Sequence, residues 1–194
     1  MEATTLSYTN LHNHGELFAN FFRARHETFI SRKRWDLPQV DGMEFDQYDT
    51  AASRWVAVHD RGQILAGVRL IPTTHQVGIY SYMIRDAQRG LLPSIPSHLL
   101  YEEAPIASHI WECSRIFVSE HVPAQQRMSV HSQLIREMVV SARHLGASKV
   151  LGLIPAVAVR GGRRVGLECV PTGPVLDIDG AHVCVEISLA TKLH

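Results

Sequence analysis

One amphipathic segment between two apolar runs places the strongest constraint on the fold. Residues 133–145 carry apolar side chains at helical spacing, and Gly146 follows at the position of a helix C-cap glycine. The preceding run, residues 111–118, and the following run, residues 149–154, are typical of buried strands. Mixed elements with one strand–helix–strand crossover indicate an α/β or α+β sheet with helices on its faces.

Weaker patterns predict the remaining elements. Asp60-Arg61-Gly62 lies between two apolar runs and predicts a hairpin turn, and Asp179-Gly180 predicts a second hairpin, of type I′. The other predicted elements are a helix over 16–30, a loop over 31–48, strands over 55–59 and 63–71, an irregular stretch over 78–100, a short helix over 155–165 that a glycine pair weakens, and strands over 175–178 and 183–189.

Length and charge narrow the class of protein. At 194 residues the chain fits one domain, predicted to span 1–194. Lys and Arg together number 19, as do Asp and Glu, so no global basic charge points to a nucleic-acid partner. No apolar run reaches the roughly 20 residues that span a bilayer, and the N-terminus lacks the apolar stretch of a signal peptide. Because the three cysteines are an odd number, we expect a reduced, cytoplasmic protein.

Glu44, Asp46 and Asp49 place three carboxylates within six residues. Such groups repel one another unless cations or hydrogen bonds hold them. A solvated acidic loop or a cluster of helix N-caps is the plain alternative, but the aromatic residues interleaved with these acids favour partial burial. Buried carboxylates need partners, and the candidates are Arg25, beside the apolar stripe of the first helix, and Arg69, in an apolar strand.

Two ionisable residues, Glu112 and Arg115, interrupt the apolar strand predicted over 111–118. In a regular strand their side chains point to opposite faces. A bulge between them would bring both to one side of the sheet. Cys113 is a weak candidate for a thiol nucleophile, because it alternates with Trp111 like a core residue.

Eight residues agree in order and spacing with the signature of a known family: Arg25, Phe29, Trp35, Asp46, Asp49, Arg69, Glu112 and Arg115. In these positions the chain resembles the acyl-homoserine-lactone (autoinducer) synthases. The resemblance covers roughly residues 10–155 and is closest over 42–49 and 112–118. It implies an N-acetyltransferase-like three-layer sandwich, in which helices flank a mixed, splayed sheet.

The resemblance implies a reaction between S-adenosylmethionine and an acyl thioester. Glu112 matches the proposed general base, which deprotonates an α-amine whose free pKa is about 8. The neutral amine attacks the thioester, and the substrate's carboxylate then closes the lactone and releases 5′-methylthioadenosine. Both reactants are substrates, so no cofactor is expected. His12 and His14 form an isolated H-x-H pair, and no metal site is predicted.

The resemblance also implies roles for the other site residues. Asp46, Asp49, Arg69 and Arg115 resemble an electrostatic cluster and are predicted catalytic residues together with Glu112. The residues expected on the S-adenosylmethionine side are Arg25, Phe29, Trp35, Met43 and Glu44. The candidate acyl-pocket residues, with ordinary core packing as the alternative, are Val139, Val150 and Leu153.

The predicted acyl donor is either an acyl carrier protein or acyl-CoA. Residues 119–128 lack the glycine with which acetyl-CoA-dependent relatives hold pyrophosphate, which counts against an ordinary acetyltransferase. Between Glu120 and Gly166 seven basic residues face two acids, and this excess suits either anionic donor or an ordinary solvated surface. Two alternative functions are an N-acyltransferase that forms no lactone and a non-catalytic sensor of an acyl ligand.

Overall fold

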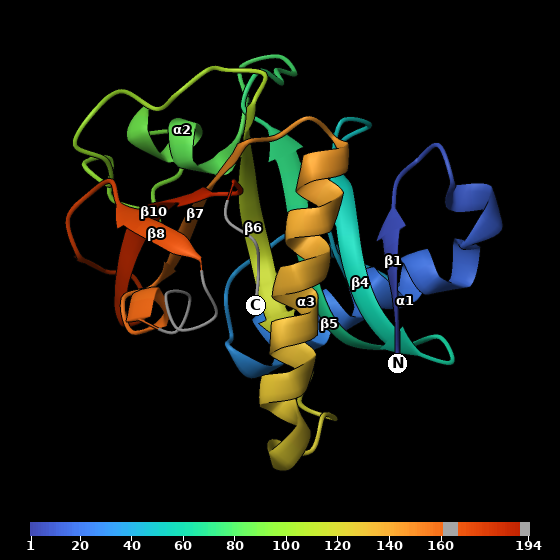
Figure 1. Cartoon of the computed structure of the whole chain (residues 1–194). Coiled ribbons are helices and arrows are strands. Elements are labelled where there is room, and N and C mark those ends of the chain that lie inside the picture. The colour runs from blue at the N-terminus through green and yellow to red at the C-terminus, as the bar shows by residue number, and fades with distance from the viewer. Residues whose placement is uncertain (161–166, 191–194) are drawn as a thin grey trace. The chain divides into compact units, whose positions relative to one another are not determined.

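The computed structural model describes residues 1–160 and 167–190, and the chain divides into two compact units. Unit 1 consists of residues 1–70 and 115–141, and unit 2 of residues 71–114 and 142–194. Each unit therefore combines two separate stretches of sequence. Strand β6 (Ile110–Val118) and helix α3 (Ala124–His144), both labelled in Figure 1, contribute residues to both units.

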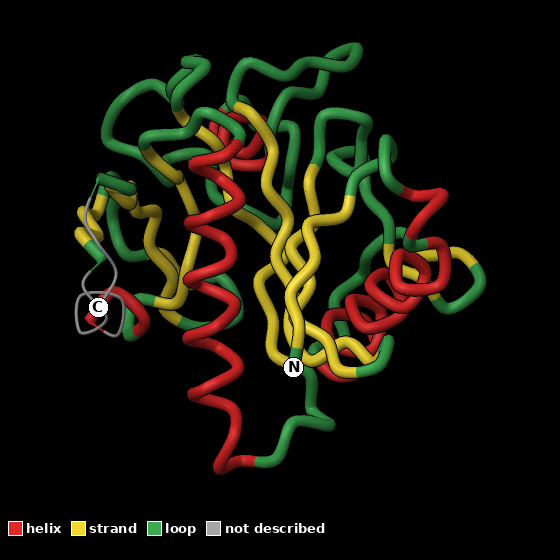
Figure 2. The backbone as a smooth tube through the Cα atoms, turned by 45° about the vertical axis from the view of Figure 1, so that its right-hand side comes forward, coloured by secondary structure: helices red, strands yellow, loops and turns green. Residues whose placement is uncertain are grey.

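Unit 1 is built on a sheet with strand order β1-β4-β5-β6. Strands β1 and β4 pair antiparallel, as do β4 and β5. Helix α1 lies on one side of these strands and α3 on the other, as Figure 2 shows. The remaining elements of this unit are β1 (Glu2–Leu6), the 3-10 turn η1 (Leu11–Asn13), α1 (Gly15–His26), the π-helical turn η2 (Glu27–Arg32), β2 (Gln39–Val40), β3 (Met43–Glu44), β4 (Arg54–Asp60) and most of β5 (Gln63–Pro72).

The two faces of this sheet are separated by the alternation of side chains along β1. Leu6 is fully buried in the aromatic core beneath α1, whereas Thr5 points the other way and its hydroxyl lies 2.5 Å from that of Ser141 on α3. The phenylalanines of α1 recur at helical spacing and form an apolar stripe. This stripe explains why that side of α1 packs against the sheet. The buried core residues on the α1 side are Leu6, Phe18, Phe21, Phe22, Phe29, Trp55, Ala57, Ile64 and Phe117.

Gly67 in β5 allows α1 to approach the sheet closely. A Cβ at this position would lie 2.9 Å from Cζ of Phe21 and 2.8 Å from Cε1 of Phe117. We expect Gly67→Ala to lower the free energy of unfolding by about 1–3 kcal/mol, because both rings are confined by the core. Urea denaturation measures the change. Gly15→Ala is the control, since nothing lies within 4 Å of its Cβ position; equal effects of the two substitutions would contradict this packing.

Unit 2 holds a mixed sheet. The first half of β6 pairs in parallel with β7, from Ile110↔Lys149 to Cys113↔Gly152. Strand β7 pairs antiparallel with β10, which pairs antiparallel with both β8 and β9. The elements of this unit, besides the shared ones, are α2 (Met83–Gln88), β7 (Lys149–Pro155), β8 (Glu168–Pro171), β9 (Leu176–Asp177) and β10 (Ala181–Ser188).

The hairpin turn predicted at Asp60-Arg61-Gly62 is confirmed. Asp60 pairs with Gln63, and Arg61 and Gly62 between them have positive φ, 48° and 84°, as a type I′ turn requires. The second hairpin turns at Asp179 and Gly180, with φ 53° and 99°, but Asp177 pairs with Ala181, so three residues connect its strands and the predicted two-residue type I′ turn is wrong. Helix α3 ends at His144, and Gly146 follows it at the predicted place of a C-cap glycine, with φ 85°. The amides of Gly146 and Ala147 bond back to Arg143 and Ala142, the Schellman pattern.

Several elements differ from the sequence prediction. Helix α3 begins at Ala124, whereas the sequence predicted a start at residue 133. The prediction missed the first turns of the helix because they are polar and show no apolar period. The stretch 78–100, predicted as irregular, contains α2, and β1 and β8 were not predicted. The short helix predicted over 155–165 extends into 161–166, which lie outside the described residues.

The predicted fold class is confirmed, because the structure is a mixed sheet with helices on its faces. The single domain over 1–194 stays a prediction. Across the described residues, no helix combines the length and the apolar character needed to cross a membrane.

Candidate active site

A balanced cluster of buried charges lies in unit 1. It contains three guanidinium groups and three carboxylates, contributed by α1, the segment from β3 to residue 49, β5 and β6. Balance matters because an unpaired charge inside a protein costs several kcal/mol, of the order of 3–5 when one partner of a buried pair is removed. The six residues are Arg25, Glu44, Asp46, Asp49, Arg69 and Arg115.

Arg25 is at the centre of this ion cluster and its side chain is fully buried. Its Nε donates to Oε2 of Glu44 at 2.6 Å, while Nη1 and Nη2 donate to Oδ1 and Oδ2 of Asp49 at 2.7 and 2.9 Å. The planar guanidinium thus binds Asp49 in the bidentate, fork-like geometry that makes arginine–carboxylate pairs strong. The pKa of Arg25 is raised: burial opposes its charge, but Asp49 and Glu44 outweigh that effect.

Arg69 and Arg115 complete the cluster. Nη1 of Arg69 bonds to Asp46 and lies 3.1 Å from Oδ1 of Asp49. Arg115 contacts Oε1 of Glu44 through Nε at 3.2 Å and Oδ2 of Asp46 through Nη2 at 2.9 Å. Arg115 has φ 55°, which breaks the regular alternation of β6 at this residue. A bulge between Glu112 and Arg115, and with it a common side for their side chains, stays a prediction.

The charges also fold the loop that carries them. The amide of Asp46 donates to Oδ2 of Asp49, and the amide of Tyr48 donates to Oδ1 of Asp46, both at 2.9 Å. Nε1 of Trp55 donates to Oδ1 of Asp49 at 2.9 Å. A segment with no regular ladder therefore satisfies its buried amides with carboxylates, which in turn are held by arginines.

The pKa of Asp49 is lowered below its ordinary value. Burial alone would raise this pKa, but the charges of Arg69 and Arg25 and the hydrogen bonds from Arg25 and the Asp46 amide outweigh burial. A depressed folded-state pKa stabilises the fold fully above the unfolded pKa of about 4 and loses that effect as pH falls through the folded value.

We therefore expect the free energy of unfolding to fall as the pH drops from about 5 towards 3, because Asp49 takes up a proton in the unfolded chain while its carboxylate stays ionised in the folded protein. Asp49→Asn removes this titrating group, so its stability should depend less steeply on pH than that of the wild type. Urea denaturation at a series of pH values measures both slopes. Parallel curves for the two proteins would argue against a paired, ionised Asp49.

An aromatic pair lies beside the ion cluster in unit 1. The rings of Phe29 and Trp35 are stacked with centroids 5.3 Å apart. Nζ of Lys33 lies 4.4 Å from the centroid of Trp35, and Cζ of Arg115 lies 5.6 Å from that of Phe29. Met43 is half-buried against the same core. Both rings thus attract cations. Phe29 is buried in the core and Trp35 is partly exposed, so Trp35 is the ring of this pair that keeps surface for a positively charged ligand.

Glu112 lies in unit 2, on the half of β6 that pairs with β7, and is fully buried. Its Oε1 accepts a hydrogen bond from the amide of Ile84 at 2.7 Å, and Oε2 accepts one from the amide of Met83 at 3.3 Å. These amides open helix α2, so the carboxylate satisfies donors that a helix start leaves free. Sequence reasoning missed them, because α2 itself was missed.

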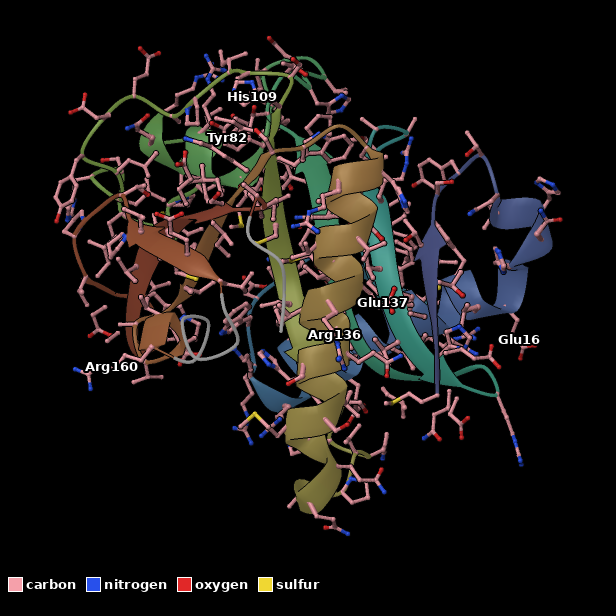
Figure 3. All side chains as sticks on the ribbon, in the orientation of Figure 1. Glu16, Tyr82, His109, Arg136, Glu137 and Arg160 are labelled. Carbon is pink, nitrogen blue, oxygen red and sulfur yellow. The ribbon has the colours of Figure 1, made fainter. Side chains whose placement is uncertain are left out.

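Three side chains have pKa values that are raised by their own burial and by the charge of Glu112. Burial, followed by the charge of Glu112, raises the pKa of Cys184 to about 12 and also raises that of Tyr82, which Figure 3 labels. The same two causes raise the pKa of Cys113 to about 12. A thiol that stays protonated at neutral pH is a poor nucleophile, which weighs against catalysis by Cys113.

Two of the three candidate acyl-pocket residues point to opposite faces of one strand. Val139 is buried on α3 in unit 1. Val150 and Leu153 both lie on β7 in unit 2, but three residues apart, so their side chains point to opposite faces. Leu153 shares a face with Leu151, the partner of Glu112 in the β6–β7 pairing. The geometry therefore favours Leu153 over Val150 on the Glu112 side, and the acyl-pocket role stays a prediction.

Much of the predicted basic excess is engaged within the fold. Arg127 donates to the carbonyl oxygens of Val118 and Ser119, Arg143 donates to that of Leu189, and Lys149 pairs with Glu186. Arg136 and Arg160 are exposed (Figure 3). Arg163 and Arg164 lie outside the described residues. Within the described ranges, no group of three or more His, Cys, Asp or Glu side chains could hold a metal ion.

The structure thus brings together six of the predicted site residues in the ion cluster. Arg25 and Glu44, predicted on the S-adenosylmethionine side, are internal members of that cluster, with no exposed side-chain surface. Phe29 and Trp35 form the neighbouring aromatic pair. Glu112 belongs to the other unit and precedes Arg115 by three residues along β6.

Comparison with known proteins identifies the family. The family model described as Autoinducer synthase matches residues 8–173. The chain is 32% identical over 166 residues to an acyl-homoserine-lactone synthase of Ralstonia solanacearum, covering 82% of this chain and 75% of that one. It is 29% identical over 171 residues to the enzyme of the same name from Acinetobacter nosocomialis, covering 84% and 87%.

Solved structures agree with these matches. TofI superposes with a TM-score of 0.77 at 27% identity, covering 97% of this chain and 92% of TofI. The acyl-homoserine-lactone synthase LasI has the same fold, with a TM-score of 0.79 at 23% identity over 99% of this chain and 91% of LasI. The family match includes all eight residues of the signature. The chain belongs to the autoinducer synthase family.

Proposed function

We propose that this chain is an acyl-homoserine-lactone synthase, which acylates the α-amine of S-adenosylmethionine and then releases an acyl-homoserine lactone and 5′-methylthioadenosine (MTA). The observation that carries the proposal is the family match over residues 8–173, because it contains the complete eight-residue signature. TofI, a structural relative at 27% identity, forms a ternary complex with an inhibitor and MTA. A product of this kind is what the proposed reaction releases.

The aromatic pair and the ion cluster suit S-adenosylmethionine. This substrate carries a sulfonium and an α-ammonium, and the stacked rings of Phe29 and Trp35 already attract the cations of Lys33 and Arg115. Arg25, Glu44 and Asp49 have no surface left for direct contact, so we assign the cluster the role of fixing the substrate-binding segment. That role is positioning, on which both chemical steps depend.

Glu112 is proposed as the general base. The substrate α-ammonium has a pKa of about 8, so a carboxylate can remove its proton at neutral pH, directly or through a water molecule. The amine nitrogen then bonds to the thioester carbon, and the thiol departs. In the second step the substrate carboxylate attacks its own γ-carbon, the C–S bond breaks, and MTA departs as a neutral thioether. Both reactants are activated, so we propose that no cofactor takes part.

The donor is proposed to be acyl-CoA or an acyl carrier protein, both anionic thioesters. Exposed Arg136 and Arg160 stay candidates for contacting such a donor, whereas Arg127 and Arg143 bond to backbone carbonyls. We also place the reaction in the cytoplasm. The presence of three cysteines, each without a disulfide in the structure, is consistent with that compartment.

A mass-spectrometric assay tests the function. Purified protein is incubated with S-adenosylmethionine and a panel of acyl-CoA and acyl-carrier-protein thioesters, and lactone and MTA are quantified together. Equal amounts of both products support the proposal and identify the preferred chain and carrier. Acylated amine without lactone would instead support an N-acyltransferase. Acyl binding without turnover would support a sensor.

A further inference from the structure

Asp86 is a fully buried carboxylate in unit 2 that the reaction above does not use. Its Oδ2 accepts a hydrogen bond from the amide of Ser81 at 2.9 Å, and its Oδ1 accepts one from the Ser81 hydroxyl, also at 2.9 Å. Nη1 of Arg89, a residue with 41% of its side chain exposed, lies 3.4 Å from Oδ1. The carboxylate thus fixes the residue just before the cap of helix α2.

The start of α2 is held by two carboxylates. Its N-cap residue, Tyr82, is extended and makes no side-chain cap hydrogen bond, so the first amides need other acceptors. Asp86 accepts from Ser81, while Glu112 accepts from Met83 and Ile84. The hydroxyl of Tyr82 donates to the carbonyl of Pro105 at 2.6 Å and further fixes this turn. The residues just before the Met83 and Ile84 amides, which bind Glu112, are thereby fixed as well.

Asp86 is the fourth residue of α2 and reaches back to the amide of Ser81, much as the acidic residue of a capping box reaches back to the start of its helix. A neutral amide side chain could accept the same bonds, and a buried carboxylate costs free energy unless its partners hold it. The gain from a carboxylate is its stronger hydrogen bonds, which are shorter and about twice as strong as neutral ones. Tight control of the Ser81 backbone is therefore the property that Asp86 adds.

We propose that Asp86 is a positioning residue for the reaction: by fixing Ser81 and the start of α2, it holds the Met83 and Ile84 amides that orient the Glu112 carboxylate. The inference rests on the proposed function, in which Glu112 is the base. A base must lie within hydrogen-bond reach of the proton it removes, and a displacement of about 1 Å can cost up to 100-fold in rate.

The test is Asp86→Asn, with kcat and KM measured for both substrates. We expect kcat to fall by about tenfold and each KM to stay within about twofold, because orientation of the base acts on the chemical step and not on binding. Thr73→Val is the matched control. Thr73 is equally buried in unit 2 and bonds to the carbonyls of Ala107 and Ile110, so its loss destabilises the unit without touching α2. Its kcat should stay within twofold of the wild type, on the order of experimental error.

A double variant separates positioning from mere stability. In the Glu112→Gln background, Asp86→Asn should lower the residual rate by less than about twofold, because its effect passes through the carboxylate. Equal rate losses in both backgrounds, or an unchanged kcat in Asp86→Asn, would overturn the proposal. If that variant does not fold, Ser81→Ala takes its place, since it removes the hydroxyl bond and keeps the amide bond; a wild-type kcat there overturns it too. A wild-type protein that makes no lactone would contradict the proposed function itself.

Discussion

Glu112→Gln is expected to lower kcat for lactone formation by about 100- to 10,000-fold, the usual contribution of a positioned general base. Glutamine has nearly the same shape and keeps one carbonyl oxygen for the Ile84 amide, which makes the shorter of the two bonds at 2.7 Å. The weaker contact to Met83, at 3.3 Å, is lost. The fold should therefore persist, with a loss of about 1 kcal/mol, the typical value for one hydrogen bond.

The assay of lactone and MTA measures this effect, and thermal unfolding checks the fold. Glu186→Gln is the matched control, since Glu186 is a partly exposed glutamate in the same unit that pairs with Lys149 on the surface. It should leave kcat nearly unchanged. A Glu112→Gln protein with the wild-type kcat would remove the base assignment and leave the family membership intact.

The second large effect concerns stability. Arg25→Met is expected to lower the free energy of unfolding by about 3–5 kcal/mol, because it leaves Glu44 and Asp49 partly unpaired in the interior. A domain of this size is stable by only about 5–15 kcal/mol, so much of the population would unfold under mild denaturation. Methionine keeps a similar volume, so packing changes little and the charge is the main variable.

Urea denaturation of Arg25→Met, followed by circular dichroism, measures the shift. Arg23→Met supplies the control on the same helix. Arg23 is exposed, and its side chain donates to Asn20 at the surface, so its loss should change stability by less than about 1 kcal/mol. A loss below that value for Arg25→Met as well would show that the ion cluster contributes little to folding.

The parts of the fold that could be predicted from the sequence are those with strong local signals. The segment Asp60-Arg61-Gly62 predicts a tight hairpin turn, and the structure has the positive φ at two adjacent residues that such a turn requires. Residues 133–145 show a full apolar period, but the polar start of α3 does not, although Val130 is buried there. Strand β1 buries only Leu6 among its apolar residues, since it lies at the edge of its sheet, and it left no clear alternation.

The site divides in the same way. Arg25 and Arg69 could be matched with the acidic loop because buried carboxylates require cations, and the structure confirms both pairings. The contact of Glu44 with Arg115 could not be predicted from local pattern, because the two residues are 71 positions apart. The amide partners of Glu112 belong to a helix of six residues, too short to show a period.

Three arginines and three carboxylates, all interlocked, also restrict how such a protein can change. A single neutral substitution leaves an opposite charge stranded in the interior, and a single charge reversal leaves two. Step-by-step mutational drift through this region therefore passes through unstable intermediates, whereas the surrounding surface can vary freely. A lineage would keep the whole set or lose it together. In descendants whose overall sequence identity is low, the residues of the cluster should be the last to change.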